Sequence, residues 1–337
     1  MGYAWEGCSS EELMDVRLCD LGLKLEGTWL EEITARVCGE LHERGLRLTP
    51  HFWLADEWFS PDGVPGVALP FYLAHRRLIR LEREQMFEVE GGTRAECVRI
   101  VRHEVGHAVD HAFGVYRRRR YQSLFGKAST TYPDFYRPNP ASRRYVQHLD
   151  GWYAQSHPSE DFAETFAVWL NPRSKWRRQY RGWPALKKLE YVDELMAELA
   201  GQKPRVRDRS RPYSLSKLRH TLRTHYDRKR DHYRAGYSEA YDRDLLKIFS
   251  DDEIDRHRPT AASFLRRRRS DIRELVAKWT GEYEFTLDQV LKQMLGRCRE
   301  LKLRTREHNE DPIVDFAIML AVHTVHSLHR GTEWHPL

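Results

Sequence analysis

The sequence of 337 residues predicts an α+β fold that ends in a mainly helical region. Two observations lead to this prediction. Segments with helical spacing and short β-favouring segments both occur before residue 113, whereas the patterned segments after residue 201 have helical spacing. A connection rich in basic residues and proline, residues 201–212, separates the two parts. We therefore expect one domain over residues 1–200 and a mostly helical region over residues 201–337.

The first domain is expected to open with a helix followed by short strands. Residues 28–46 place apolar side chains at helical spacing, which predicts an amphipathic helix. Residues 46–56 and 67–73 favour β structure and flank a turn rich in proline and glycine, so each predicts a strand. Residues 77–82 alternate less cleanly but could supply another strand.

The next helix, expected over residues 93–113, contains the sequence HEVGH, an HExxH pattern. Its histidines, His103 and His107, are four residues apart, so their Cβ atoms lie about 6 Å apart on one face and both imidazoles can reach one metal ion. Glu104 is rotated by about 100° from His103, which suits a base acting on metal-bound water. Because HExxH also arises by chance in helices, a zinc site requires a third ligand.

A later helix, expected over residues 157–170, offers that ligand. Pro158 fits its first turn, and Glu160 and Glu164 fall on a common face. Two carboxylates placed there repel each other unless a cation or hydrogen-bond donors hold them, and a metal site provides such a cation. Spacing alone allows either glutamate to be the ligand.

Two neighbours of the motif fit the role of ligand less well. His111 lies eight residues after His103, about 12 Å along a helix, so it cannot share one ion with both motif histidines. Asp110 is better placed to support a ligand than to bind the metal.

The segment between the two helices, residues 115–147, is crowded with arginine, tyrosine and proline. Proline prevents long regular structure there. One interpretation is a loop packed by its own aromatic side chains. The other is a wall of a substrate cleft, since binding residues often lie on loops held by a rigid scaffold.

Three helices are expected in the C-terminal region, over residues 214–233, 286–303 and 312–329, the second with a capping box at Thr286 and Gln289. The last of them carries three histidines at three-residue spacing: His323, His326 and His329. Their apolar neighbours favour a core element over a second metal site.

The order of HEVGH, Tyr153 and the sequence EDFAE at 160–164 resembles the gluzincin branch of the zincin metallopeptidases. The likeness extends to bacterial zinc-binding metallopeptidases and the catalytic domain of anthrax lethal factor, and it covers about residues 29–170. Its specific part is HExxH followed by a tyrosine seven residues before the glutamate that begins an ExxAE pattern. The resemblance implies a zincin-like metallopeptidase domain over residues 1–200.

Position by position, the resemblance also implies roles for single residues. One zinc ion per chain would be bound by His103, His107 and Glu160. Glu104 would be the catalytic base, and Tyr153 would stabilise the oxyanion. Glu164 would support a ligand imidazole from the second shell, although exchange with Glu160 stays open.

The function implied is that of a zinc-dependent endopeptidase, a hydrolase that cleaves a peptide or protein substrate by attack of a zinc-bound water activated by Glu104. The alternative is a non-catalytic, zinc-stabilised binding or regulatory protein that engages nucleic acid or a protein partner through a basic surface. Lys and Arg exceed Asp and Glu by 56 − 50 = 6, with runs at 117–120 and 266–269, and a solvated basic face explains these runs best. The presence of Glu104 favours the enzyme, because structural zinc needs no base.

Composition predicts a cytoplasmic protein with no membrane partner. The opening residues are acidic and mixed, unlike a secretory signal, and the five cysteines contain no CxxC pair. The most apolar run, residues 313–322, contains Asp315 and is too short to span a bilayer.

Overall fold

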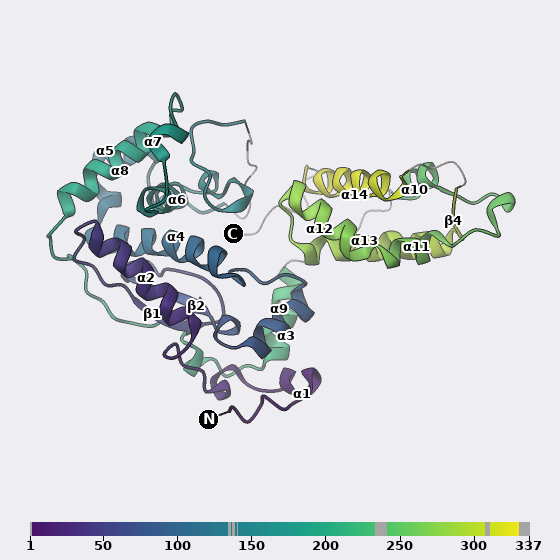
Figure 1. Ribbon diagram of the computed structural model, residues 1–337, viewed down its shortest axis with the longest axis horizontal. Helices are drawn as coiled ribbons and strands as arrows, with labels where there is room; N and C mark the ends of the chain where they lie inside the picture. The colour runs from purple at the N-terminus through teal and green to yellow at the C-terminus, as the bar shows by residue number, and fades with distance from the viewer. Residues whose placement is uncertain are drawn as a thin grey trace. The chain divides into compact units, whose positions relative to one another are not determined.

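The computed structural model describes residues 2–133, 136, 139, 141–232, 241–306 and 311–329, and for residues 325–329 only the backbone (Figure 1). It contains two compact units. The described residues up to Asp227, apart from 86–88, form the first, and residues 86–88 with the described residues from Arg228 onward form the second. Helices dominate both units, and each holds a two-stranded sheet. The predicted α+β, mainly helical fold is confirmed.

These helices belong wholly or mainly to the first unit: α1 (Ser10–Met14), α2 (Trp29–Glu43), α3 (Arg76–Met86), α4 (Arg94–Phe113), α5 (Arg119–Leu124), α6 (Pro158–Leu170), α7 (Trp176–Gln179), α8 (Leu186–Leu199) and α9 (Leu222–His232). The last residue of α3, and α9 from Arg228 onward, belong to the second unit. Short 3₁₀ helices lie between the helices of the first unit: η1 (Leu18–Leu21), η2 (Phe71–Ala74), η3 (Val115–Arg117), η4 (Asp150–Gln155) and η5 (Leu215–Lys217). Its strands are β1 (His51–Ala55) and β2 (Gly66–Pro70). The expected helices and strands over residues 28–73, 93–113 and 157–170 are thus confirmed.

The sheet of the first unit is parallel. β1 pairs with β2 in a register that runs from His51 opposite Gly66 to Ala55 opposite Pro70. On the other edge of β2, the amide of Ala68 donates to the carbonyl of Phe59 at 2.8 Å in an antiparallel bridge. The connection between the strands therefore folds back beside the sheet.

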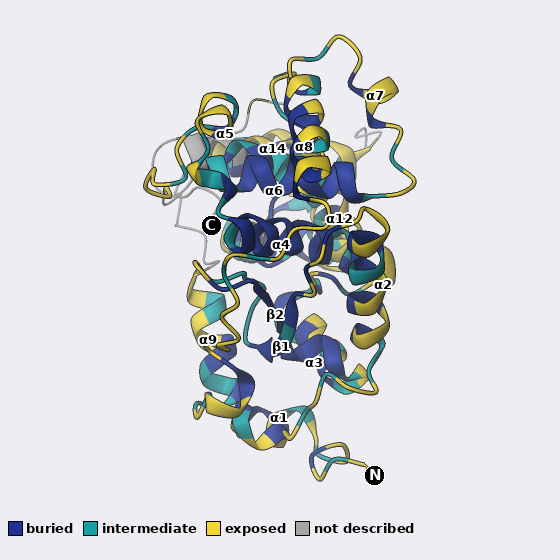
Figure 2. Ribbon diagram, turned by 90° about the vertical axis from the view of Figure 1, so that its left-hand side faces the viewer, coloured by how far each residue is buried: buried dark blue, intermediate teal, exposed yellow. Residues whose placement is uncertain are grey.

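Helix α4 runs through the centre of the first unit and packs against α2, α6 and β2. The hydroxyl of Thr93 accepts from the amide of Glu96 at 3.2 Å and caps its start. Gly114, at φ 62°, ends it in the left-handed conformation that glycine adopts without strain. Every residue from Ile100 to Asp110 is buried, which Figure 2 shows as an almost unbroken dark helix.

Helix α4 is joined to α2 by a buried ion pair. Arg102 donates to both carboxylate oxygens of Glu40, at 2.7 and 2.6 Å, and both side chains are buried. Such a bidentate ion pair restrains both the distance between the two helices and their rotation relative to each other.

Helix α4 meets α6 at Gly106. A Cβ atom at this position would lie 3.0 Å from Cα of Ala163 and 3.2 Å from its carbonyl oxygen. The absence of a side chain in the middle of HExxH thus lets the backbones of the two helices approach closely.

Two sequence predictions in the first unit were wrong. Residues 77–82 form part of α3 rather than a strand, because Leu78 and Leu81 are three residues apart and both are fully buried on one helical face. The helix expected over residues 214–233 begins only at Leu222. Before it, the carbonyls of Leu218 and His220 accept from Cys19 and Leu18, so the backbone there pairs with the N-terminal segment.

Residues 201–227 belong to the first unit and form hydrogen bonds with its earlier segments. The amides of Arg205 and Val206 donate to the carbonyl of Ala112 at 2.9 and 3.1 Å, and the indole of Trp53 donates to the carbonyl of Pro212 at 3.0 Å. The expected domain boundary after residue 200 stays a prediction, and the compact units divide after Asp227.

The second unit has these elements: α10 (Asp242–Ile248), β3 (Phe249–Ser250), η7 (Glu253–Asp255), α11 (Ala261–Arg267), α12 (Arg269–Thr280), α13 (Glu284–Glu300), β4 (Arg304–Thr305) and α14 (Pro312–His329). Its helices surround one apolar core. The capping box expected at Thr286 was wrong, because burial of Phe285 and Leu287 extends α13 to Glu284, with Tyr283 at the cap.

Charged side chains of the second unit pair internally. Arg269 and Arg273 both contact the fully buried carboxylate of Asp288, so part of the basic run at 266–269 is neutralised within the unit. His323 lies 2.8 Å from a carboxylate oxygen of Asp244, while the side chains of His326 and His329 lie outside the described residues. None of the described helices is long and apolar enough to cross a membrane.

Candidate metal centre

His103, His107 and Glu160 converge at one point between α4 and α6, and we call them the helix cluster. Oε2 of Glu160 lies 2.9 Å from Nε2 of His103 and 3.1 Å from Nε2 of His107, and the two nitrogens are 3.2 Å apart. Ligands at about 2.0–2.2 Å from a tetrahedral zinc ion are about 3.4 Å from one another. The cluster therefore needs little change to hold a metal ion, and all three side chains are buried.

Glu164 sets the tautomer of one ligand imidazole. Its Oε1 lies 2.8 Å from Nδ1 of His103, and its Oε2 accepts from the amide of Leu149 at 2.9 Å. Because an ionised carboxylate only accepts, Nδ1 of His103 carries a proton toward Glu164, and Nε2 is the nitrogen that faces the cluster. The two glutamates therefore make different contacts. Glu160 contacts Nε2 of both imidazoles, whereas Glu164 contacts only Nδ1 of His103.

The electrostatic environment of the cluster favours a cation. Burial alone would lower the pKa of His103, but hydrogen bonds to Glu160 and Glu164 outweigh it and raise that pKa well above its ordinary value. Burial would raise the pKa of Glu160, yet His107 and His103 hold it well below the usual range. The carboxylates therefore stay ionised around two imidazoles, which attracts a proton or a metal ion.

Glu104 lies beside the cluster. It is buried, and its Oε2 has no hydrogen-bond partner among the described residues. Burial raises its pKa above 4.5, while His103 and His107 oppose that change. A buried carboxylate oxygen without a partner is costly, so this position is explained best by a ligand or water that Glu104 contacts.

Tyr153 lies on η4, with its ring 5.5 Å from that of His103. Burial, and then the charges of Glu160 and Glu104, raise its pKa well above the ordinary value, so the phenol keeps its proton and can donate it. Its hydroxyl has no hydrogen bond to the part of the chain that the structure describes, and the residue lines the cleft described below.

Tyr132 is a site residue that sequence reasoning missed. Its hydroxyl donates to Oε1 of Glu160 at 2.7 Å, which leaves Oε2 to face the imidazoles. Its ring stacks on His157 at 3.6 Å, and His157 is the residue that caps α6 by accepting from the amide of Ser159. The only signal in the sequence was its location in the aromatic segment before α6.

The cluster opens into a cleft of about 960 Å³. One wall comes from residues 58–63, which follow β1, and another from residues 116–132, as the cleft interpretation of that segment expected. His111 lines the cleft outside the cluster, 3.5 Å from Asp62, and burial lowers its pKa to about 4. Asp110 is also outside, where it accepts from the amide of Tyr116 at 2.8 Å.

Comparison with known families agrees with this geometry. Residues 82–178 match the model of a family described as "Putative zinc-binding metallo-peptidase". The matched segment contains α4, the aromatic segment and α6, and so the helix cluster together with Glu104, Tyr132, Tyr153 and Glu164, whereas the cleft wall at residues 58–63 lies outside it. No curated protein and no solved structure matches the chain.

Proposed function

We propose that this protein is a zinc-dependent endopeptidase of the gluzincin type, cytoplasmic, with one catalytic zinc ion held by His103, His107 and Glu160. The observation that carries the proposal is the buried carboxylate of Glu104, whose Oε2 has no hydrogen-bond partner among the described residues and lies where the cluster meets the cleft. The match to a metallopeptidase family supports it. The five free cysteines are typical of a reducing compartment.

The residues of the cluster suit zinc rather than calcium or magnesium. Two imidazoles and one carboxylate are the ligand set of many catalytic zinc sites, with a fourth position left open. When bound, zinc would act as a Lewis acid and lower the pKa of a coordinated water from its high value in bulk to about 7.

Side chains of the protein carry out the remaining steps of the proposed reaction. Glu104 accepts the proton of the attacking water and passes it to the leaving nitrogen. Tyr153 donates a hydrogen bond to the oxygen that becomes negative when the peptide carbonyl is attacked. Glu164 holds a proton on Nδ1 of His103, so that Nε2 is the nitrogen that would bind the metal, and Tyr132 orients Glu160.

The cleft wall suits an extended peptide. Residues 58–60 lie beside β2, where Phe59 forms a β-bridge with Ala68. The same three residues line the cleft. A peptide that adds to this segment through its backbone would pass the helix cluster, which is a common mode of peptide recognition.

Replacement of Glu104 by Gln tests the proposal directly. The amide cannot accept a proton in catalysis, so cleavage of a peptide library should fall by roughly 10²- to 10⁴-fold while zinc content stays unchanged. Mass spectrometry of the library and elemental analysis of the protein measure the two quantities. Glu96→Gln, in the first turn of the same helix, is the matched control and should keep full activity. Equal cleavage by Glu104→Gln and the natural protein would contradict the proposal.

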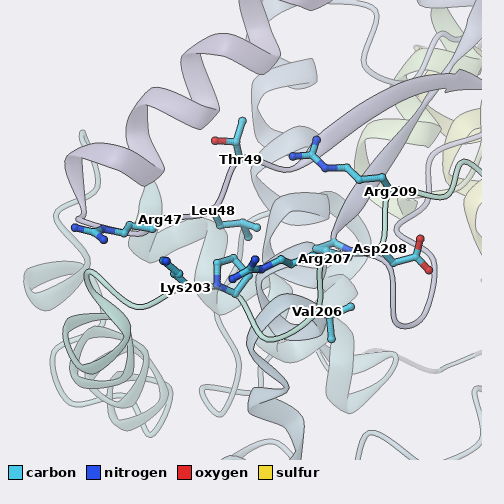
Figure 3. A pocket seen from close by; sticks show the side chains of 10 residues that line it. Arg47, Leu48, Thr49, Lys203, Val206, Arg207, Asp208 and Arg209 are labelled. Atoms are coloured by element: carbon cyan, nitrogen blue, oxygen red, sulfur yellow. The ribbon is translucent and has the colours of Figure 1, made fainter.

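A second candidate function is a non-catalytic, zinc-stabilised binding protein. The observation that favours it is a basic pocket of about 410 Å³, around which Figure 3 shows Arg47, Lys203, Arg207 and Arg209. Such a pocket attracts phosphate or an acidic protein surface. Salt-dependent binding of nucleic acid, together with no cleavage of any peptide by the zinc-loaded natural protein, would favour this candidate.

A further inference from the structure

A second group of metal-ligating side chains lies in the first unit, away from the helix cluster. Ligand atoms of Asp56, His220 and His225 all lie within 4.8 Å of one another. Asp56 directly follows the last residue of β1, and the two histidines come from the segment that opens α9. We call these three residues the strand-end cluster.

The backbone holds His220 in place independently of its side chain. Its carbonyl accepts from the amide of Leu18 at 3.0 Å, and Thr221 forms a bridge with Arg17. The next amide, of Leu222, donates to the carbonyl of Val16 at 2.9 Å. The backbone on both sides of His220 is therefore held by hydrogen bonds to residues 16–18 before α9 begins.

His225 lies in the first turn of α9, where its amide donates to the carbonyl of Thr221 at 3.0 Å. Its buried imidazole meets the fully buried ring of Phe71 edge to face, with ring centres 5.3 Å apart. The same imidazole lies nearly parallel to that of His220, at 6.5 Å and 24°. Packing thus fixes the orientation of one ligand and places the second alongside it.

We propose that Asp56, His220 and His225 form a second divalent-cation site, of the class that binds zinc. Two imidazoles and one carboxylate match the preferences of zinc and similar first-row ions. The three ligand atoms already lie within 4.8 Å of one another, close to the separation of about 3.4 Å that a tetrahedral ion requires. Asp56 and His220 are only partly buried, so an ion bound there would be accessible to solvent and water would complete its coordination.

The task of this ion is to connect two distant parts of the chain. Asp56 and His220 are 220 − 56 = 164 residues apart in the sequence. The residues that follow Asp56 form the 58–63 wall of the cleft, so an ion at the strand-end cluster fixes the base of that wall to the start of α9. The inference does not depend on the proposed peptidase function, because it concerns metal content alone.

Titration of metal-free full-length protein with Co²⁺, followed by visible absorption, and with Zn²⁺ in competition with a chromophoric chelator, tests the proposal. The natural chain should bind two equivalents. Asp56→Asn and His220→Ala should each keep the first equivalent and weaken the second by at least 10-fold. Asp62→Asn, in the same connection after β1, is the matched control and should bind two. The proposal would be overturned if both cluster variants bound as many equivalents as the natural chain, with undiminished affinity, whether that number is one or two.

A thermal-shift measurement provides a second test of the proposal if one of the variants folds poorly. In a Glu160→Ala background, which removes a ligand of the helix cluster, Zn²⁺ should still raise Tm through the strand-end cluster. In Glu160→Ala combined with His220→Ala, that rise should disappear. An equal rise in both proteins would show that the added stability comes from elsewhere and would contradict the assignment.

Discussion

The helix cluster takes its ligands from two helices packed against each other, whereas the strand-end cluster joins the end of a strand to a segment 164 residues further along. The first is buried and lies among charged side chains, including Glu164 and Glu104. The second is partly exposed and lies against aromatic rings.

This difference indicates different consequences of metal binding. Ligands of the helix cluster are positioned by helix packing and by hydrogen bonds, so an ion bound there would be free to serve the proposed chemistry at the cleft. The strand-end cluster draws together remote segments, so its ion contributes to stability of the folded chain by binding only that state. Removal of metal should therefore cost activity at the first cluster and thermal stability at the second.

The largest expected effect concerns the scaffold of the helix cluster. Glu40→Ala leaves the guanidinium of Arg102 buried without its partner, which typically costs about 3–5 kcal/mol of unfolding free energy. Glu32→Ala is a matched control, since Glu32 pairs with Arg94 across the same two helices at 2.7 Å, but in solvent, and should cost less than about 1 kcal/mol. Urea denaturation of both variants measures the difference, and equal losses would show that burial of the first pair is unimportant.

The next effect separates a cluster that serves chemistry from one that serves stability. Tyr153 lines the cleft, and Tyr153→Phe removes its hydroxyl while retaining the ring beside His103. Turnover should fall by roughly 10²- to 10³-fold with zinc content and Tm unchanged, because the hydrogen bond strengthens in the transition state. Tyr116→Phe, which also lines the cleft, should change kcat little. An unchanged kcat for Tyr153→Phe on a cleaved peptide would remove this residue from the mechanism.

The helix cluster could be predicted from the sequence because its information is local. The spacing of His103 and His107 places both on one helical face, and the spacing of Glu160 and Glu164 does the same on α6. Sequence left the roles of the two glutamates open, since only the rotation of α6 against α4 brings Glu160 to both imidazoles. Tyr132 escaped prediction because its hydrogen bond depends on how an irregular loop folds back over α6.

The strand-end cluster could not be predicted from the sequence for a related reason. Its histidines occur without a recognisable spacing, and Asp56 comes from another part of the chain. The segment 214–233 was also expected to be a continuous helix, which would have placed His220 and His225 on different helical faces. Backbone pairing with the N-terminal segment interrupts that helix and creates the observed arrangement.

A third prediction tests how the charged surroundings of the helix cluster depend on pH. Burial raises the pKa of Asp110 to about 6, above its ordinary value of 3.8, despite hydrogen bonds from Tyr116 and Tyr121. Between these values the folded protein binds more protons than the unfolded chain, so stability falls as pH rises from about 4 to 6. Asp110→Asn, which keeps an acceptor for Tyr116, should gain at most about 3 kcal/mol relative to the natural protein over that rise. Denaturation of both metal-free proteins from pH 4 to 7 measures this gain, and a difference that does not vary with pH would contradict it.

The smallest effect tests whether the spacing between α4 and α6 controls the helix cluster alone. In Gly106→Ala the added methyl meets the backbone of Ala163 at 3.0 Å and the ring of Phe166 at 3.2 Å, an overpacking that typically costs about 1–3 kcal/mol. Glu160 is three residues before Ala163 on the same helix, so displacement of α6 moves this carboxylate away from both imidazoles. Metal affinity at the helix cluster should fall by about 10-fold, because a loss of about 1.4 kcal/mol has that effect.

The strand-end cluster should keep its affinity in Gly106→Ala, since no ligand of that cluster lies on α4 or α6. Gly39→Ala is the matched control, because a Cβ at this position in α2 meets no atom within 4 Å and alanine stabilises a helix by roughly 0.5–1 kcal/mol relative to glycine. Competitive Zn²⁺ titration of the three proteins resolves the two affinities. Equal weakening of both clusters in Gly106→Ala would mean that the substitution loosens the whole first unit, whereas selective weakening locates the control of the helix cluster at the contact between Gly106 and Ala163.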